Sequence, residues 1–487
     1  MSIKNDVNKI LLKKYPHLEI SVVKYSEVQT DNESKRIDSE YFKQEYLENE
    51  RIIKSRDYTK LFNVCYFIRN GDDCRDYEEN GVKYIRTGDI KEYGLDLNNC
   101  ATIRNDFISE IKLSIGDLLI TRKGNYGKSQ VINKKEILKS IISSEIFLIK
   151  LKNINPYYTD TFLKSKFGQS QFERNIHGVS NFSVTQEALL NFLIPMFSKE
   201  FQLEIEAMVK DSHKALENSK KLYKEAEKIL YEALGLDAEN PLESILSFRE
   251  KNKVIHNHLK RYKRLNISIR TYKESYLKTG RLDAEYYQEK FRKNEILIKN
   301  FSHSKLSDLV NIQKSIEPGS EAYQDDGIEF IRVANLGKFE LSKSYIYLDK
   351  IKFINELERL YPQKDMILLT KDGSIGIAYC VPENLNCITS AAILHLKIKD
   401  KNIILPQVLT LIINSIIGQL QAQRDSGGAI ISHWTISEIE NILIPLLDLK
   451  TQRKIEAKVK QSFELRDKSK ELLENAKVKI ENAIIDS

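Results

Sequence analysis

The chain has 487 residues, of which 41% are hydrophobic and 30% are charged, with a formal net charge of +7. This length is too great for one hydrophobic core, so we expect two to four domains. The sequence has no run of about 20 apolar residues, which a membrane-spanning helix needs. The N-terminal segment also lacks the apolar core that is typical of a secretory signal. The composition predicts a multidomain cytoplasmic protein whose mild positive charge permits a polyanionic partner without requiring one.

The first predicted elements recur about 245 residues later. An extended segment at 20–25 (ISVVKY) has a counterpart at 267–272 (ISIRTY). The start of a short helix at 36–42 (RIDSEYF) has a counterpart at 281–287 (RLDAEYY). Self-similarity with a period of half the chain indicates a duplicated domain and not a solenoid.

A mixed region of strands and one helix is predicted next in each half. Short apolar runs bounded by Gly, Asp and Asn indicate strands. These runs lie at 82–85, 118–120 and 146–151, and again at 328–331, 366–369 and 393–398. A helical stretch at 159–172 follows the strands and is matched at 407–421.

A glycine-containing loop follows the middle strand in each half. It reads TRKGNYG at 121–127 and TKDGSIG at 370–376. Two glycines three positions apart allow a tight turn and a close approach of the backbone to a ligand. We call these segments the first and second glycine loops.

The glycine loops keep their glycines while the side chains between them change. Arginine and lysine can neutralise phosphates or bind guanine edges, and acidic or amide side chains can bind cytosine and adenine. Different side chains on one loop shape are expected if two different sequences are read, although an ordinary turn with solvated lysines is the alternative. The candidate nucleic-acid contacts are Arg86, Arg122, Lys123, Asn125, Tyr126, Lys128, Arg332, Lys371, Asp372 and Ser374.

Two parts of this assignment stay open. Arg86 and Arg332, each two residues after an aromatic, either face a ligand or brace the domain through a carboxylate. The loops around Ser180 and Asn181, and around His433 and Trp434, are a weaker second choice, because they lie near the start of the next helix and packing roles are the alternative.

Each half ends in a Leu-Ile-Pro tripeptide and a long helix. In the first helix, mostly apolar or small residues from Ile205 to Ala233 recur at intervals that alternate between four and three positions, which indicates a coiled-coil seam. The same seam recurs 250 residues later, with identical pairs Ser212/Ser462, Ser219/Ser469, Ala226/Ala476 and Ala233/Ala483. Neither helix can bury its stripe alone, so we expect the two to pack together. Roughly 30 residues of helix span about 45 Å.

The sequence contains no complete signature of a catalytic or metal-binding site. The segment 155–158 (NPYY) lacks the second proline of an amino-methyltransferase motif, and 124–129 (GNYGKS) lacks the first glycine of a phosphate loop. Five cysteines without CxxC spacing indicate reduced thiols, because zinc needs tighter pairs and histidines. We expect a binding protein that is not an enzyme and has no cofactor or metal of its own. The basic run at 258–264 (HLKRYKR) fits a solvated helix face.

These motifs, occurring twice in the same order over nearly the whole chain, resemble the DNA-specificity (S) subunit of type I restriction-modification systems. The resemblance implies an α/β (α+β) fold with two target-recognition domains and two spacer helices that form an antiparallel coiled coil. The implied boundaries are 1–198 and 266–447 for the two domains, 199–235 and 448–487 for the helices, and 236–265 for a linker.

The resemblance also implies the function and the partners. Each domain would read one half of a bipartite, asymmetric site in double-stranded DNA. The length of the two helices suggests half-sites roughly one helical turn, or about 34 Å, apart. The helices would dock two adenine methyltransferase subunits that bind S-adenosylmethionine, and restriction-translocase subunits would join them. Two alternatives remain: an S-like subunit of another DNA-modification or defence system, and a protein scaffold that binds no DNA.

Overall fold

A computed structural model describes residues 3–18, 20–30, 35–92, 94–97, 99–176, 182–248, 269–426 and 433–486. The chain forms two compact units, the first made of residues 1–217 with 466–487 and the second of residues 218–465. Two long helices, α8 (Lys199–Ala233) and α17 (Leu449–Asp486), each contribute one half to each unit. The basic run at 258–264 lies outside the described residues, and the domain boundaries implied by the resemblance stay a prediction.

The first unit contains short strands in several small sheets. The strands are β1 (Tyr58–Lys60), β2 (Cys65–Asn70), β3 (Tyr77–Ile85), β4 (Ile90–Lys91), β5 (Gly94–Leu95), β6 (Ala101–Ile103), β7 (Leu118–Thr121), β8 (Ser129–Val131), β9 (Ile141–Ile142), β10 (Ile146–Leu151) and β11 (Leu193–Pro195). The helices are α1 (Ile3–Lys14), α2 (Tyr25–Thr30), η1 (Ser39–Phe42), α3 (Gln44–Lys54), α4 (Leu61–Val64), η2 (Thr87–Asp89), η3 (Lys135–Lys139), α5 (Pro156–Lys164), α6 (Lys166–Asn175) and α7 (Gln186–Leu190).

The second unit repeats this architecture. Its strands are β12 (His303–Lys305), β13 (Val310–Lys314), β14 (Tyr323–Gln324), β15 (Ile328–Ile331), β16 (Tyr347–Leu348), β17 (Ile367–Thr370), β18 (Ala378–Cys380), β19 (Cys387–Thr389), β20 (Ile393–Ile398) and β21 (Leu443–Pro445). Its helices are α9 (Pro241–Ser247), α10 (Tyr276–Thr279), α11 (Glu289–Lys299), α12 (Leu306–Leu309), η5 (Ser320–Ala322), η6 (Val333–Asn335), α13 (Ile354–Leu360), α14 (Pro406–Asn414), α15 (Ile416–Asp425) and α16 (Ile436–Glu440).

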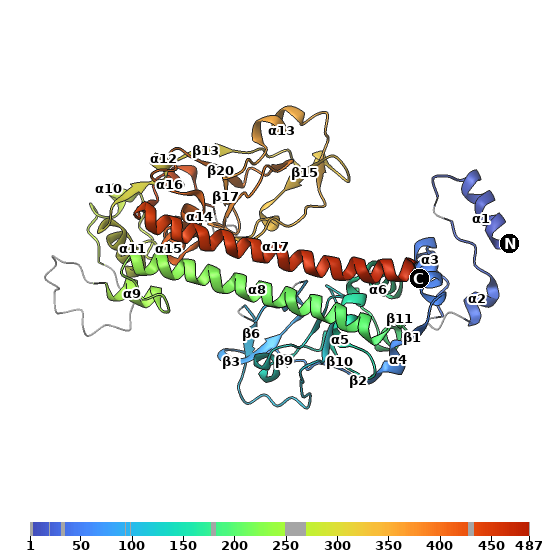
Figure 1. Cartoon of the computed structure of the whole chain (residues 1–487). Helices are drawn as coiled ribbons and strands as arrows, with labels where there is room; N and C mark the ends of the chain where they lie inside the picture. Colours follow the sequence, from blue (N-terminus) through green and yellow to red (C-terminus); the bar gives the residue numbers. More distant parts are fainter. Residues whose placement is uncertain are drawn as a thin grey trace. The chain divides into compact units, whose positions relative to one another are not determined.

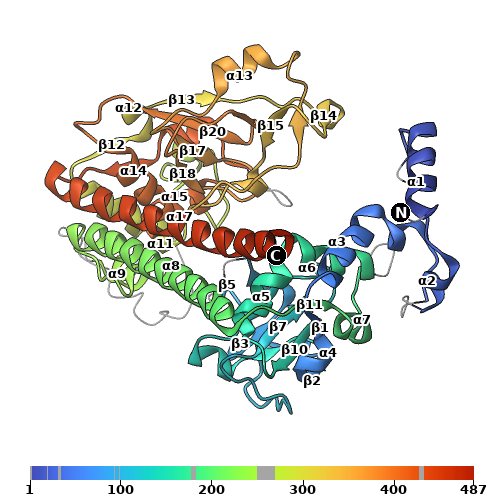
Figure 2. The ribbon, with the colours of Figure 1, turned by 45° about the vertical axis from the view of Figure 1, so that its right-hand side comes forward.

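The central sheet of each unit is antiparallel and four-stranded. Its strand order is β2-β10-β7-β8 in the first unit and β13-β20-β17-β18 in the second (Figure 2). A strand inside such a sheet is an apolar run when both of its faces are covered. In β7, Leu118 and Ile120 join the cluster that includes residues of α5 and α6, and Leu119 joins a cluster with Ile85 and Ile90.

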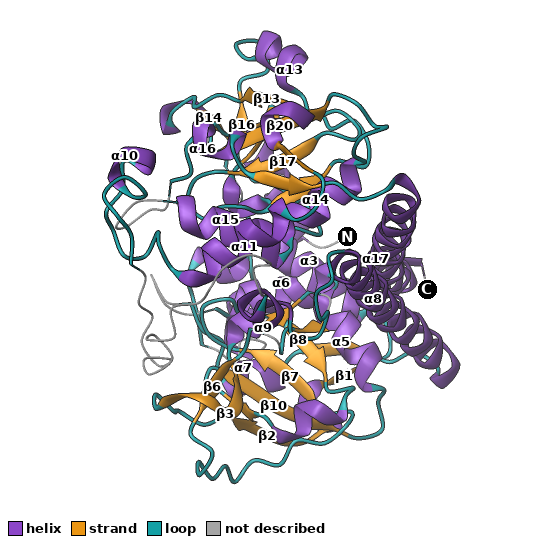
Figure 3. Cartoon of the chain, turned by 90° about the vertical axis from the view of Figure 1, so that its left-hand side faces the viewer, coloured by secondary structure: helices purple, strands orange, loops and turns teal. Residues whose placement is uncertain are grey.

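The second central sheet is covered in the same way. In β17, Ile367 and Leu369 pack with residues of α14 and α15, and Leu368 packs with Ile331 on the opposite face. Figure 3 shows α14 and α15 on one side of this sheet. Each glycine loop therefore begins at the end of a strand that is buried on both faces.

The helical stretches predicted at 159–172 and 407–421 are each divided into two helices by a serine. Ser165 and Ser415 have extended backbones, and their side chains cap the helices that follow, α6 and α15. The next helix then approaches the preceding one closely. A Cβ atom on Gly168 would lie 2.3 Å from the carbonyl oxygen of Phe162, so only glycine fits here.

The two long helices run antiparallel within each unit (Figure 1). In the first unit, Ser212 contacts Ser469, and Glu204, nearer the start of α8, contacts Lys479, nearer the end of α17. In the second unit, the hydroxyls of Ser219 and Ser462 lie 3.1 Å apart. The predicted class is confirmed: mixed helix and sheet in two repeated units with an antiparallel pair of long helices.

Among the described residues, no helix is both long and apolar enough to cross a membrane. The same residues contain no cluster of three or more His, Cys, Asp and Glu side chains that could hold a metal ion. All five cysteines are free thiols, and Cys74 and Cys387 are buried.

A buried histidine in the second unit should make stability depend on pH. Burial lowers the pKa of His395 from 6.5 to about 4, and the ring hydrogen-bonds to Thr389 at 2.8 Å. Below the ordinary pKa, the unfolded chain binds a proton that the folded chain does not bind. Stability is therefore lost as the pH falls from about 6.5 to about 4, by about 1–2 kcal/mol at pH 5.

This pH dependence can be measured with His395→Gln, which keeps a hydrogen-bonding side chain that does not titrate. We expect a smaller fall in melting temperature between pH 7 and pH 5 for this variant than for the wild type. His213, whose pKa burial also lowers to about 4, remains in both proteins and contributes equally. Parallel curves for the two proteins would contradict the assignment.

Candidate nucleic-acid interface

The first glycine loop is closed by the threonine at its start. The hydroxyl of Thr121 donates to the Asn125 carbonyl at 2.5 Å and accepts from the Lys128 amide at 3.0 Å. The amide of Gly127 donates to the Thr121 carbonyl at 3.0 Å. Gly124 and Gly127 have φ of +64° and +75°, a left-handed backbone that favours glycine.

The second glycine loop has the same hydrogen bonds. The Thr370 hydroxyl donates to the Ser374 carbonyl at 2.5 Å and accepts from the Ile377 amide at 2.9 Å. The Gly376 amide donates to the Thr370 carbonyl at 2.9 Å, and φ of Gly376 is +76°. The two loops thus have one backbone framework, which does not depend on the side chains between the glycines.

A glutamine from the following helix holds each loop from behind. Nε2 of Gln169 donates to the Gly127 carbonyl at 3.1 Å, and Nε2 of Gln419 donates to the Gly376 carbonyl at 2.7 Å. Sequence reasoning missed these residues. The signal was present, because G-Q-x-Q occurs 250 residues apart, at 168–171 and 418–421.

Arg122 turns toward the unit that carries it. Its Nη1 donates to the Ser144 carbonyl at 3.2 Å, and its guanidinium carbon lies 5.5 Å from the centre of the Phe147 ring. Its Nε is buried and has no hydrogen-bond partner among the described residues. These contacts brace the base of the loop, so we do not retain Arg122 as a candidate ligand contact.

The remaining candidates of the first loop lie at or near the surface. Asn125 is exposed, whereas Lys123 and Lys128 are half-buried. Tyr126 is also half-buried and packs edge-on against Phe182, with ring centres 6.3 Å apart. Within the described ranges neither Lys123 nor Lys128 forms an ion pair, so this loop presents positive charge.

Lys128 has a second cation beside it. Burial and the neighbouring Lys91 lower the pKa of Lys128, and Glu92 offsets this only in part. Lys91 lies in β4, and its sequence position gave no signal of this proximity. An anion bound near Lys128 would relieve the repulsion between the two cations.

The second glycine loop has a different arrangement of charged side chains. Lys371 forms an ion pair with Oδ2 of Asp372, and Oδ1 of Asp372 lies 2.8 Å from Nδ1 of His433. Burial would raise the pKa of Asp372, but the hydrogen bonds from Lys371 and His433 hold it below its usual range. Ser374 is exposed at the tip of the loop.

In each unit another segment, around Ser183 or His433, lies beside the glycine loop. Isolated antiparallel bridges pair Lys123 with Ser183 and Asp372 with His433. Trp434 is fully buried in the core of its unit, so it has a packing role. Ser180 and Asn181, the other residues of the second choice, lie outside the described residues.

Arg86 and Arg332 are exposed and occupy equivalent positions. The guanidinium carbon of Arg86 lies 5.9 Å from the centre of the Tyr77 ring, and that of Arg332 lies 6.0 Å from the Tyr323 ring. No ion pair with a carboxylate is recorded for either side chain in the part of the chain that the structure describes. This arrangement does not favour the bracing alternative, and both arginines stay candidates.

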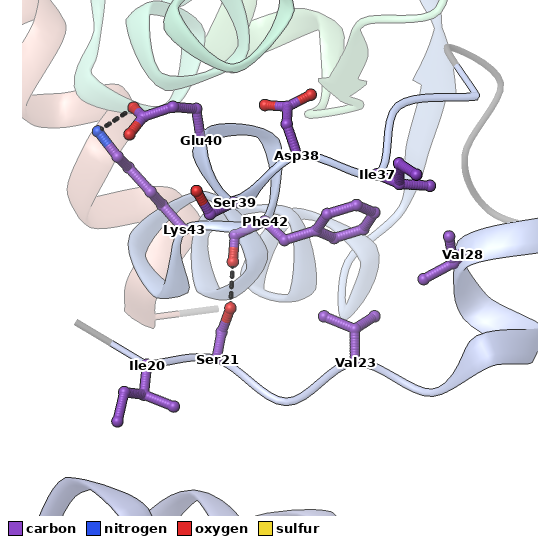
Figure 4. Close-up of a pocket in the computed structure, with 10 residues that line it drawn as sticks. All are labelled: Ile20, Ser21, Val23, Val28, Ile37, Asp38, Ser39, Glu40, Phe42 and Lys43. Carbon is purple, nitrogen blue, oxygen red and sulfur yellow. Dashed lines mark hydrogen bonds and ion pairs between the residues drawn. The ribbon is translucent and has the colours of Figure 1, made fainter. Parts of the chain in front are cut away.

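The repeated segments at 36–42 (RIDSEYF) and 281–287 (RLDAEYY) have structural roles. Nε and Nη2 of Arg36 bind Asp38 at 2.7 and 2.6 Å, and its Nη1 donates to the carbonyls of Arg174 and Ile176 at the end of α6. Arg281 repeats the contact with its own aspartate. A pocket of about 540 Å³ lies beside the first block (Figure 4), where the Ser21 hydroxyl donates to the Phe42 carbonyl.

Comparison with known proteins identifies a domain in the second half of the chain. Residues 298–478, which include the second glycine loop, match the family model described as the type I restriction modification DNA specificity domain. The type I restriction enzyme EcoBI specificity subunit of Escherichia coli is 26% identical over 215 residues. Residues 298–478 therefore form a type I restriction modification DNA specificity domain. The sequence resemblance is thereby confirmed.

The matches to individual specificity subunits are partial or distant. The alignment with the E. coli subunit covers 42% of this chain and 45% of that protein, so the chain spans less than half of this curated relative. The S subunit from M. genitalium has 14% identity and a TM-score of 0.40, covering 88% of this chain and 94% of that chain. The HsdS subunit from Thermoanaerobacter tengcongensis has 15% identity and a TM-score of 0.28, covering 88% and 96%.

Proposed function

We propose that this specificity subunit binds double-stranded DNA at a bipartite, asymmetric site, with one half-site read by each repeated unit. The observation that carries the proposal is the pair of glycine loops. Their backbones are held by the same hydrogen bonds, whereas their side chains differ in charge. A shared framework suits the phosphate backbone common to all DNA, and differing side chains suit different bases. The interface comprises Lys123, Asn125, Tyr126, Lys128 and Ser374, with Arg86, Arg332, Lys371 and Asp372 in support.

The long helices support the second part of the proposal. Two antiparallel helices present two similar surfaces, which suits recruitment of two copies of one partner to a single asymmetric chain. We infer that these partners are adenine methyltransferase subunits that bind S-adenosylmethionine, and that restriction-translocase subunits complete the complex. In this arrangement the specificity subunit is not an enzyme and binds no cofactor, and its helices fix the distance between half-sites.

The domain boundaries remain part of the proposal. Target-recognition domains at 1–198 and 266–447, spacer helices at 199–235 and 448–487, and a linker at 236–265 assign one glycine loop to each domain. The observed bounds of α8 and α17 fall within the two helical segments. Each domain would then supply its own DNA contacts.

Charge reversal in the first loop tests the DNA-binding proposal. Lys123→Glu with Lys128→Glu should weaken binding of the full chain to its DNA site at least about tenfold. If both lysines contact phosphates, the slope of log K against log salt should also decrease by about 2. Fluorescence anisotropy at several salt concentrations measures both quantities.

The matched control is Lys135→Glu with Lys139→Glu, which changes the charge equally at two exposed lysines of η3. We expect this control to keep most of the affinity and the wild-type slope. Equal losses in both double variants would show only a general charge effect. Wild-type binding that scarcely depends on salt would favour the scaffold alternative.

A further inference from the structure

The residue pairs that bridge the two loops differ between the units. In the first unit Lys123 lies opposite Ser183, and in the second unit Asp372 lies opposite His433. The surrounding backbone has the same hydrogen bond in both units. The backbone amide of Val184 donates to the Arg122 carbonyl at 2.9 Å, and the backbone amide of Trp434 donates to the Lys371 carbonyl at 2.8 Å. One framework therefore presents two chemically different pairs.

Asp372 is committed to contacts within its own unit. One carboxylate oxygen binds His433 and the other binds Lys371. Its side chain is 23% exposed, whereas that of His433 is 62% exposed. A half-buried carboxylate with both oxygens engaged is poorly placed to bind a base, although the sequence had suggested that role for Asp372. The exposed member of the pair is the histidine.

The contact with Asp372 also determines which atom His433 offers. An ionised carboxylate only accepts hydrogen bonds, so Nδ1 of His433 carries the proton that it donates. In the neutral ring Nε2 is then an acceptor, and none of the described residues donates a hydrogen bond to it. In the DNA major groove the complementary donors are the amino groups of adenine and cytosine.

We propose that His433 reads one base of the second half-site through Nε2, and that Asp372 is the positioning residue that fixes its ring and tautomer. The proposal rests on the proposed function, and the group recognised is the exocyclic amino group of adenine or cytosine. In the first unit the same positions hold Ser183 and Lys123. That pair offers a hydroxyl and a cation, so the first half-site is read by different chemistry.

The test maps adenine methylation by single-molecule sequencing on DNA with randomised half-sites. The full chain is co-expressed with its methyltransferase as wild type, His433→Ala, His433→Gln or Asp372→Asn. We expect His433→Ala to lose about tenfold discrimination at one position of the second half-site and to leave the first half-site unchanged. Asp372→Asn should relax the same position. His433→Gln, which restores an acceptor, should recover part of the preference.

The control is Ser183→Ala, at the equivalent position of the first unit, which should leave the second half-site unchanged. A wild-type second half-site in His433→Ala would overturn the assignment. Uniform weakening at every position would also overturn it, because that pattern indicates a structural role. These outcomes leave the proposed function intact, whereas a wild-type protein that gives no bipartite motif overturns both.

Discussion

Gly168→Ala should strongly lower the stability of the first unit. The new Cβ would lie 2.3 Å from the Phe162 carbonyl oxygen and 2.5 Å from Cα of Leu163. Both are backbone atoms of α5, so no side-chain rotation can relieve the overlap. Separating α5 from α6 would disrupt a fully buried part of the core, at a cost of about 3 kcal/mol.

Thermal unfolding of the full chain measures this effect. We expect Gly168→Ala to lower the melting temperature of the transition that includes the first unit by at least about 5 °C. The control is Gly88→Ala, because a Cβ there has no atom within 4 Å and the backbone is not left-handed. Similar melting temperatures for the two variants would show that the α5–α6 contact is looser than the structure indicates.

Ser212→Leu should have the second large effect, on the pairing of the long helices. Ser212 and Ser469 are 0% and 1% exposed. The Ser212 hydroxyl donates to the Ser469 carbonyl at 2.8 Å and lies 2.9 Å from the Ser469 hydroxyl. Leucine cannot fit between backbones this close and would cost about 1–3 kcal/mol. It would also remove a polar contact that fixes the register of the seam.

A double-mutant cycle separates the packing effect from the hydrogen bond. Ser212→Ala alone should cost about 1 kcal/mol, and adding Ser469→Ala should cost little more, because neither partner is then left unpaired. Lys214→Leu, at an exposed position of the same helix, is the control for added apolar bulk and should be nearly neutral. Thermal unfolding again provides the measurement, and additive costs would contradict the coupling of the two serines.

The sequence predicted the elements whose pattern is local. The four-three spacing from Ile205 and the repeated serines indicated the long helices, and the observed helix α8 covers 199–233. The duplication predicted that both glycine loops share one shape. The division of each helical stretch at Ser165 and Ser415 was not predicted, because a serine that caps a helix looks like any polar residue within one.

The candidate site could be predicted only in outline. The glycine spacing located the loops, but it could not show that Arg122 turns inward toward Phe147. The pairing of Asp372 with His433 joins residues 61 positions apart, and the approach of Lys91 to Lys128 depends on the folding of β4. Such contacts arise from tertiary structure, which local pattern does not specify.

The central claim is that two repeated units read two different half-sites, and methylation mapping tests it most directly. Adenine methylation would be sequenced in host DNA with and without this gene while the methyltransferase partner is expressed. We expect methylation at one bipartite, asymmetric motif to disappear when the gene is removed. An unchanged methylation pattern, in cells where the partner is active, would contradict the claim.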